Sequence, residues 1–176
     1  MNRLQHFSLH TTQLGHFQKL NQQLLEGLNR HIDDKNTRKT HLFFGRYENI
    51  YISSDQVPQI SEILNSVIKI AAKILKRPSC ELKAGLWFNV MNPGDKTTLH
   101  KHDDDDELLS AVYYIKVPSN SGSLILGKEP AYTKLTPQEG LLAFFPPNMP
   151  HEVTENLSQE CRISLGINIG PLLPEE

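Results

Sequence analysis

The sequence predicts a single α+β domain, residues 1–176, in which N-terminal helices pack against a double-sheet jelly roll or a small barrel. A chain of 176 residues has the length of one domain. Apolar residues recur at helical spacing before residue 80, and short strand-like segments separated by turn residues follow from residue 81. We therefore expect a helical support region at 1–80 and a β core at 81–170.

Two apolar stripes predict the helices of the first half. Between Leu14 and Ile32 the apolar residues are spaced by three and four, which places them on one face of a helix. A second stripe runs from Ile60 to Leu75 and stops before Arg77-Pro78. The segment 41–52 between them is rich in aromatic and β-branched residues and favours one or two strands. The residues that can begin the second helix are Ser53, Ser54 and Asp55 as N-caps and Pro58 in the first turn.

The second half of the chain indicates about eight short strands. The expected strands are 82–91, 97–102, 108–117, 122–127, 131–135, 140–145, 151–155 and 160–169. Turns rich in proline, glycine and asparagine separate them, as at 92–95 and 146–150. Strands at roughly ten-residue spacing are typical of a jelly roll or a small barrel.

Composition excludes several classes of protein. Hydrophobic residues make up 38% and charged residues 22% of the chain, which argues against a disordered or fibrous protein. The net charge is −2 without a polybasic tract, so we expect no nucleic-acid partner. No apolar run is long enough to span a membrane, and residues 1–14 lack the apolar core of a signal peptide. Two cysteines, Cys80 and Cys161, make no disulfide framework, so we expect a reducing cytoplasm.

Three of the eight histidines, His100, His102 and His151, lie in the strand-rich half. Residues two apart in a strand point to the same side, so His100, His102 and Asp104 can share one face. A divalent metal ion accepts neutral imidazoles and a carboxylate together. His151 follows a proline-rich turn and can meet this face from another strand. Two histidines and one carboxylate on one side of an iron ion leave positions open for oxygen and a chelating co-substrate.

Arg162 falls within a strand pattern of apolar residues: Ile163, Leu165, Ile167 and Ile169. A guanidinium in an apolar strand needs a reason, and one reason is a bound carboxylate held by two parallel hydrogen bonds. Ser164 faces the same side and can donate a second hydrogen bond, while Tyr114 offers a phenol from a neighbouring strand. The competing interpretation of Arg162 is a surface residue at a strand end.

These motifs, in this order, resemble those of the iron(II)/2-oxoglutarate-dependent oxygenases. The resemblance covers residues 86–169 and includes the prolyl-hydroxylase branch and a bacterial and phage group of 2-oxoglutarate oxygenases. The motifs that carry it are His102-x-Asp104, Val112-Tyr113-Tyr114-Ile115, Pro150-His151-Glu152-Val153 and Arg162-x-Ser164. It implies a double-stranded β-helix with N-terminal helices packed on it.

The resemblance also implies the site. Iron would be bound by His102, Asp104 and His151, while Arg162, with Ser164 and Tyr114, would hold the far carboxylate of 2-oxoglutarate. The bacterial and phage group shows HxH at this place, and one alignment makes His100 the ligand in place of Asp104. We prefer Asp104, because a carboxylate partly neutralises Fe(II) and three neutral imidazoles do not.

The implied activity is that of a dioxygenase that uses Fe(II), 2-oxoglutarate and O2 to hydroxylate an unactivated C–H bond of a protein, peptide or small molecule. The expected partners are 2-oxoglutarate and an unidentified substrate, without nucleic acid or membrane, and a homodimer is left open. Trp87, Asn89, Met91 and the segment 119–123 are expected to contribute to substrate contacts.

A cupin-type metal enzyme or metal-binding barrel is the alternative. It would place metal on His100, His102, Glu107 and His151 without 2-oxoglutarate, and would leave Arg162 and Ser164 without a role.

Overall fold

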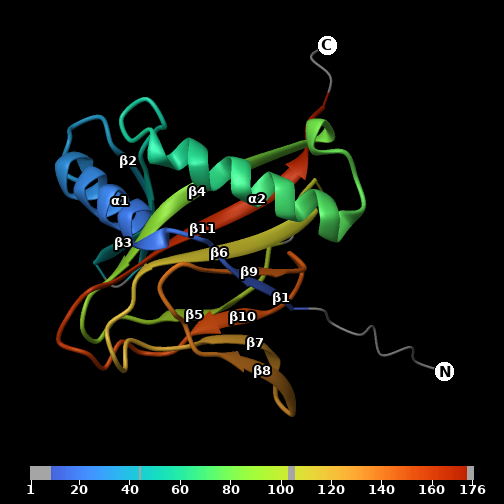
Figure 1. Cartoon of the computed structure of the whole chain (residues 1–176). Coiled ribbons are helices and arrows are strands. Elements are labelled where there is room, and N and C mark those ends of the chain that lie inside the picture. The colour runs from blue at the N-terminus through green and yellow to red at the C-terminus, as the bar shows by residue number, and fades with distance from the viewer. Residues whose placement is uncertain (1–8, 44, 103–105, 174–176) are drawn as a thin grey trace.

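The computed structural model describes residues 9–43, 45–102 and 106–173, which form two stacked antiparallel β-sheets and two helices (Figure 1). The helices are α1 (Phe17–His31) and α2 (Gln59–Leu75), with a short 3-10 turn at Ser79–Glu81. The strands are β1 (His10–Gln13), β2 (Arg38–Phe43), β3 (Arg46–Tyr51), β4 (Leu82–Met91), β5 (Thr97–His100), β6 (Leu109–Lys116), β7 (Leu124–Lys128), β8 (Ala131–Leu135), β9 (Leu141–Phe145), β10 (His151–Val153) and β11 (Arg162–Pro171).

The larger sheet has seven strands in the order β1-β9-β6-β11-β4-β3-β2, and the smaller sheet has four in the order β5-β10-β7-β8. Both helices lie on the outer face of the larger sheet, and the smaller sheet lies on its opposite side (Figure 1). The structure therefore confirms a mostly β architecture with two N-terminal helices. None of the described helices is long and apolar enough to cross a membrane.

Most of the apolar core lies between the helices and the larger sheet. Leu24 and Leu28 of α1 and Ile63 and Val67 of α2 pack there against apolar side chains of β4, β6 and β11. The second apolar cluster, between the sheets, is far smaller and is built around Leu124, Leu126 and Phe145. The space between the sheets is thus left open to polar side chains.

Strand alternation produces this division. Along β11, Ile163, Leu165, Ile167 and Ile169 join the core beneath the helices. The residues between them face the other way and line a pocket between the sheets: Arg162, Ser164, Gly166 and Asn168. β6 follows the same rule, with Tyr113 in the core and Ser110 and Tyr114 in the pocket.

Two details of the first half differ from expectation. Helix α2 begins after Pro58, and Ser53 instead forms a turn in which its hydroxyl accepts a hydrogen bond from the Gln56 amide at 3.3 Å. The prediction of Ser53, Ser54 and Asp55 as helix caps was therefore wrong. Strand β1 was not predicted, and it exists because it pairs along its length with β9.

Candidate functional site

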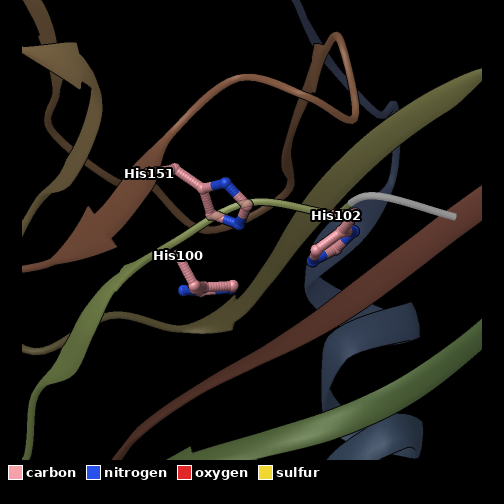
Figure 2. Close-up of side chains that lie close together, drawn as sticks. All are labelled: His100, His102 and His151. Atoms are coloured by element: carbon pink, nitrogen blue, oxygen red, sulfur yellow. The ribbon is translucent and has the colours of Figure 1, made fainter.

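Three imidazoles converge at one end of the pocket between the sheets. His100 ends β5, His151 begins β10, and the two face each other in the register of that strand pair. His102 follows two residues after His100, and one ring nitrogen from each histidine lies within 4.8 Å of the others. Figure 2 shows the three rings turned toward a common centre. Such a cluster of ring nitrogens has the composition and spacing of a metal site.

The proline-rich turn between β9 and β10 positions the histidines. The carbonyl of Pro147 accepts a hydrogen bond from the His102 amide at 3.0 Å, which ties the segment after β5 to this turn. Pro150 accepts another from the Gly127 amide at 2.7 Å. Because prolines donate no backbone hydrogen bond and have a fixed φ, the turn is stiff and its carbonyls are free to accept. Residues far apart in sequence are held together in this way.

All three rings use Nδ1 for a hydrogen bond within the protein. His100 Nδ1 lies 2.8 Å from the carbonyl oxygen of Thr98, and His151 Nδ1 lies 2.8 Å from that of Met149. His102 Nδ1 lies 3.2 Å from a carboxylate oxygen of Glu107. Since carbonyl and carboxylate oxygens only accept, Nδ1 carries the proton in each ring, and Nε2 keeps its lone pair. Three Nε2 lone pairs then remain as donors for a metal ion.

Burial keeps His151 in the neutral form that a metal requires. Desolvation, with smaller contributions from His100 and His102, lowers the pKa of His151 to about 4, against the opposing effect of the Met149 carbonyl. At neutral pH its imidazole is therefore uncharged and able to coordinate.

The structure brings His102 and His151, predicted as ligands, together with His100, the alternate ligand. Asp104, the carboxylate ligand preferred from the sequence, lies outside the described residues. The described donor set consists of three imidazoles, which suits iron as well as zinc, copper or nickel.

Arg162 begins β11, across the pocket from the histidines, and pairs with no carboxylate among the described residues. Its side chain is only 2% exposed and lines the same pocket as the histidines. One guanidinium nitrogen donates to the carbonyl of Ser121 at 3.4 Å, and Nε has no partner among the described residues. Burial lowers the pKa of Arg162, while Tyr114 opposes that shift. A buried cation with unused donors is costly unless an anion binds beside it, so the site is suited to a carboxylate.

Tyr114 and Ser164 lie where the sequence analysis expected them. The guanidinium of Arg162 lies 5.8 Å from the centre of the Tyr114 ring, and Ser164 pairs with Tyr114 across β6 and β11. Both side chains line the pocket. Burial raises the pKa of Tyr114 to about 12, although Arg162 lowers it, so the phenol keeps its proton. Two neutral hydroxyl donors thus stand beside the cation.

The rest of the pocket wall comes from β3 and β4. Trp87 and Asn89 line it as expected for substrate contacts, whereas the fully buried Met91 does not. Glu48 and Asn49 also line it, and sequence reasoning missed them because it treated 41–52 only as strand. β3 has no regular alternation of polar and apolar residues that would have singled them out, because Glu48 and Asn49 are adjacent in the strand. Of the segment 119–123, it is the Ser121 carbonyl that meets Arg162.

A second buried arginine, Arg46, lies beside the segment that leads into β5. Arg46 contacts Glu48 at 2.8 Å and Asp95 at 3.4 Å, and it also donates to the carbonyl of Lys96 at 3.2 Å. Thr97, the first residue of β5, donates to the same Glu48 carboxylate at 3.1 Å. This network fixes the start of the strand that ends in His100.

Comparisons with known proteins show which enzymes share this fold. No model of a known protein family and no curated protein matches the chain. A prolyl-4-hydroxylase from Pseudomonas putida is similar in structure with a TM-score of 0.70 at 18% identity, over 95% of this chain and 89% of that one. A prolyl hydroxylase from Trichoplax adhaerens, solved with a hypoxia inducible factor peptide, gives 0.67 at 16% identity, over 93% and 83% of the two chains.

A third similar structure is that of an enzyme that catalyses a different reaction. SnoN, a non-haem α-ketoglutarate-dependent epimerase of nogalamycin biosynthesis, gives a TM-score of 0.72 at 11% identity, over 93% of this chain and 76% of that one. At these identities the likeness shows the fold alone. The chain has the fold of the 2-oxoglutarate-dependent non-haem iron oxygenases.

Proposed function

We propose that the chain is an Fe(II)- and 2-oxoglutarate-dependent dioxygenase that hydroxylates an unactivated C–H bond. The observation that carries the proposal is that one pocket contains both a candidate metal site and a candidate site for the carboxylate of 2-oxoglutarate. Three imidazoles meet on the side of the smaller sheet, and on the larger sheet lies a buried guanidinium that pairs with no carboxylate among the described residues. A metal ion and a dicarboxylate would satisfy both at once.

The proposed metal ligands are His100, His102 and His151. His102 and His151 belong to either ligand set drawn from the sequence, and the described geometry supports His100 as the third. Replacing His100 with Ala is then expected to weaken Mn(II) binding at least tenfold, whereas Asp104→Ala leaves it within twofold. The reverse result would assign the third position to Asp104.

Arg162 would pair with the far carboxylate of 2-oxoglutarate, and Ser164 and Tyr114 would donate to the same group. When bound, the metal, 2-oxoglutarate and O2 supply the oxidation, which turns 2-oxoglutarate into succinate and CO2 and places one oxygen atom in the substrate. The protein's residues bind and orient these groups and exclude water from the pocket.

The substrate we propose is a protein, a peptide or a small molecule, in which one C–H bond is hydroxylated. The similar structures include one solved with a peptide and one from the biosynthesis of a small molecule. Fold alone does not choose between these classes. A double-stranded β-helix spanning 81–170, within one domain of 1–176, is the arrangement that we infer for the catalytic core. The cytoplasmic location and the absence of nucleic-acid and membrane partners stay predictions.

The cupin alternative is less well supported by the described contacts. It needs Glu107 as a metal ligand, but Glu107 contacts Nδ1 of His102, whereas the proposed ligand atom is Nε2. It also leaves the buried charge of Arg162 without a purpose.

Thermal unfolding of the metal-free protein under anaerobic conditions tests the proposal, with Mn(II) in place of Fe(II) and with or without 2-oxoglutarate. A ligand at 100 times its Kd stabilises the folded state by about 2.7 kcal/mol. For a chain of this size each kcal/mol raises Tm by roughly 2–4 °C. We expect 2-oxoglutarate to raise Tm only when Mn(II) is present.

The other outcomes count against the proposal. A shift with Mn(II) that 2-oxoglutarate does not increase would favour the cupin-type alternative. If neither Mn(II) nor 2-oxoglutarate changes Tm, the proposed metal site is wrong. Catalysis is then tested by succinate formation with Fe(II), 2-oxoglutarate and O2.

A further inference from the structure

Glu107 lies directly behind the ring of His102. Its Oε1 is 3.2 Å from His102 Nδ1 and accepts a hydrogen bond from the Ser110 hydroxyl at 2.6 Å. The Ser110 hydroxyl is also 3.3 Å from His102 Nδ1. Carboxylate, hydroxyl and imidazole therefore form a closed triangle that fixes the orientation of the ring.

The burial of this carboxylate needs an explanation. Glu107 ends an acidic run that the sequence favours as a solvated loop, yet its side chain is only 4% exposed. Oε2 has no hydrogen-bond partner among the described residues, and the partners of Oε1 are a hydroxyl and an imidazole. A buried carboxylate is costly unless a positive charge lies close. A metal ion on the far side of the His102 ring would supply that charge.

Among the described residues, the side chains that meet at the centre are three imidazoles, and an uncharged imidazole brings no negative charge to offset that of a divalent ion. In metal sites, a carboxylate that accepts the second N–H of a ligating histidine fixes its tautomer and makes the ligand more basic.

We propose that Glu107 is a positioning residue of the metal site, and that through its contact with His102 it brings a negative charge close to the bound ion. This inference rests on the metal site of the proposed function. Glu107 holds the Nδ1 proton, directs Nε2 of His102 toward the centre and raises its affinity for a cation.

Metal affinity, measured without turnover, tests this role. We compare Mn(II) dissociation constants and the visible absorption of the Co(II) form for the natural chain, Glu107→Gln and Asp106→Asn. Glu107→Gln keeps the size of the side chain and an oxygen that can accept a hydrogen bond from Nδ1–H of His102, but it loses the charge. Asp106→Asn removes the same charge from the neighbouring exposed residue and is the matched control.

We expect Glu107→Gln to weaken Mn(II) binding by about 10- to 100-fold and to alter the Co(II) spectrum, while Asp106→Asn leaves both unchanged. Thermal unfolding of the metal-free variants shows whether each is folded. Ser110→Ala, which keeps the carboxylate, is expected to weaken binding by less than Glu107→Gln.

The failures of the two proposals are distinguishable. If the natural chain binds Mn(II), and His102→Ala abolishes binding, but Glu107→Gln leaves the dissociation constant and the Co(II) spectrum unchanged, this inference is overturned and the proposed function stands. If Asp106→Asn weakens binding as much as Glu107→Gln, the effect is one of general charge, and the inference is also overturned. If the natural chain binds no metal, both fail.

Discussion

Arg162 holds a buried charge at the expense of stability. Its side chain is 2% exposed, and no carboxylate is paired with it in the part of the chain that the structure describes. We expect Arg162→Met to raise the free energy of unfolding of the ligand-free protein by about 1 kcal/mol, because an apolar side chain of similar length removes the desolvation cost. The same variant should keep Mn(II) binding and lose the response to 2-oxoglutarate. Chemical denaturation and calorimetric titration measure the two effects.

Arg38→Met is the matched control for this change. Arg38 is exposed on β2, where it lies 4.8 Å from the centre of the Tyr51 ring. Its replacement should change stability by less than about 0.5 kcal/mol and leave 2-oxoglutarate binding intact. Normal 2-oxoglutarate binding by Arg162→Met would remove Arg162 from its assigned role.

His151 should make the metal-free protein sensitive to acid. Burial lowers its pKa from 6.5 to about 4. Between pH 6.5 and about 4, the imidazole is therefore protonated in the unfolded chain and neutral in the folded chain. The unfolded state is then favoured, and the free energy of unfolding falls by up to about 1.4 kcal/mol per pH unit until the pH reaches about 4, a loss of about 3 kcal/mol at most. Urea titrations between pH 7 and 4, in the presence of chelator, measure this slope.

The variant His151→Gln isolates this contribution. Glutamine does not titrate in this range, so the slope of stability against pH should become shallower between pH 6.5 and 4. An identical slope in both proteins would mean that other groups cause the acid sensitivity.

At the scale of elements, the buried amide of Asn21 adds hydrogen bonds to the apolar packing of helix α1 on the larger sheet. Asn21 donates to the Ile115 carbonyl of β6 at 2.8 Å and accepts from the Tyr113 hydroxyl at 2.6 Å. Asn21→Ala leaves both buried groups without these bonds, and each unsatisfied group costs about 1–3 kcal/mol. We expect a loss of about 3 kcal/mol in the free energy of unfolding.

Gln22→Ala is the neighbouring control, because Gln22 is exposed and bonds only to Glu26 of the same helix among the described contacts. It should change stability by less than about 0.5 kcal/mol. Equal effects of Asn21→Ala and Gln22→Ala would show that helix formation, and not docking, is being measured.

Strand β10 depends on a close backbone approach at Gly122. Its φ is +89°, and a Cβ at this position would collide with the carbonyl oxygen of Thr154, just after β10. Gly122→Ala should therefore destabilise the protein by about 2 kcal/mol or more and lower Tm. Gly85→Ala on β4, where nothing lies within 4 Å, should leave Tm nearly unchanged. Differential scanning calorimetry compares the two, and a neutral Gly122→Ala would contradict the reasoning.

The sequence predicted elements well where a local pattern sufficed. Strand β4 has the predicted bounds, and the strands that carry His100, His151 and Arg162 lie within a few residues of their predicted places. β1 was missed because its four residues carry little strand pattern of their own and are extended by pairing with β9. Partners from distant strands are not encoded in local periodicity.

The candidate site shows the same limit. Two-residue spacing placed His100 and His102 on one face, and the turn before His151 indicated a third imidazole. The contact of Glu107 with His102 depends on the path of the intervening chain, so the spacing made Glu107 only a ligand in the cupin alternative. Likewise, the burial of Arg162 without a paired carboxylate among the described residues became visible only in the folded structure.

For the molecule as a whole, the first 80 residues are part of the same folding unit as the second half. They supply β1, β2 and β3 of the larger sheet and both helices that cover it. A fragment of residues 81–176 would expose the apolar face that α1 and α2 cover, so we expect it to show no cooperative thermal transition and to bind ANS. Circular dichroism and ANS fluorescence test this. A fragment that unfolds cooperatively and binds Mn(II) would show instead that the second half is autonomous.

The pairing of His100 with His151 in register has a consequence for the order of events in the cell. Four strands, β6 to β9, lie between these two residues in the chain, so ribosomes make His100 well before His151. A growing polypeptide carries two of the three imidazoles for some time, and they meet the third only after a long loop has closed. Under the proposed function, tight binding of the metal ion would therefore begin only once β10 has paired with β5 in the finished molecule.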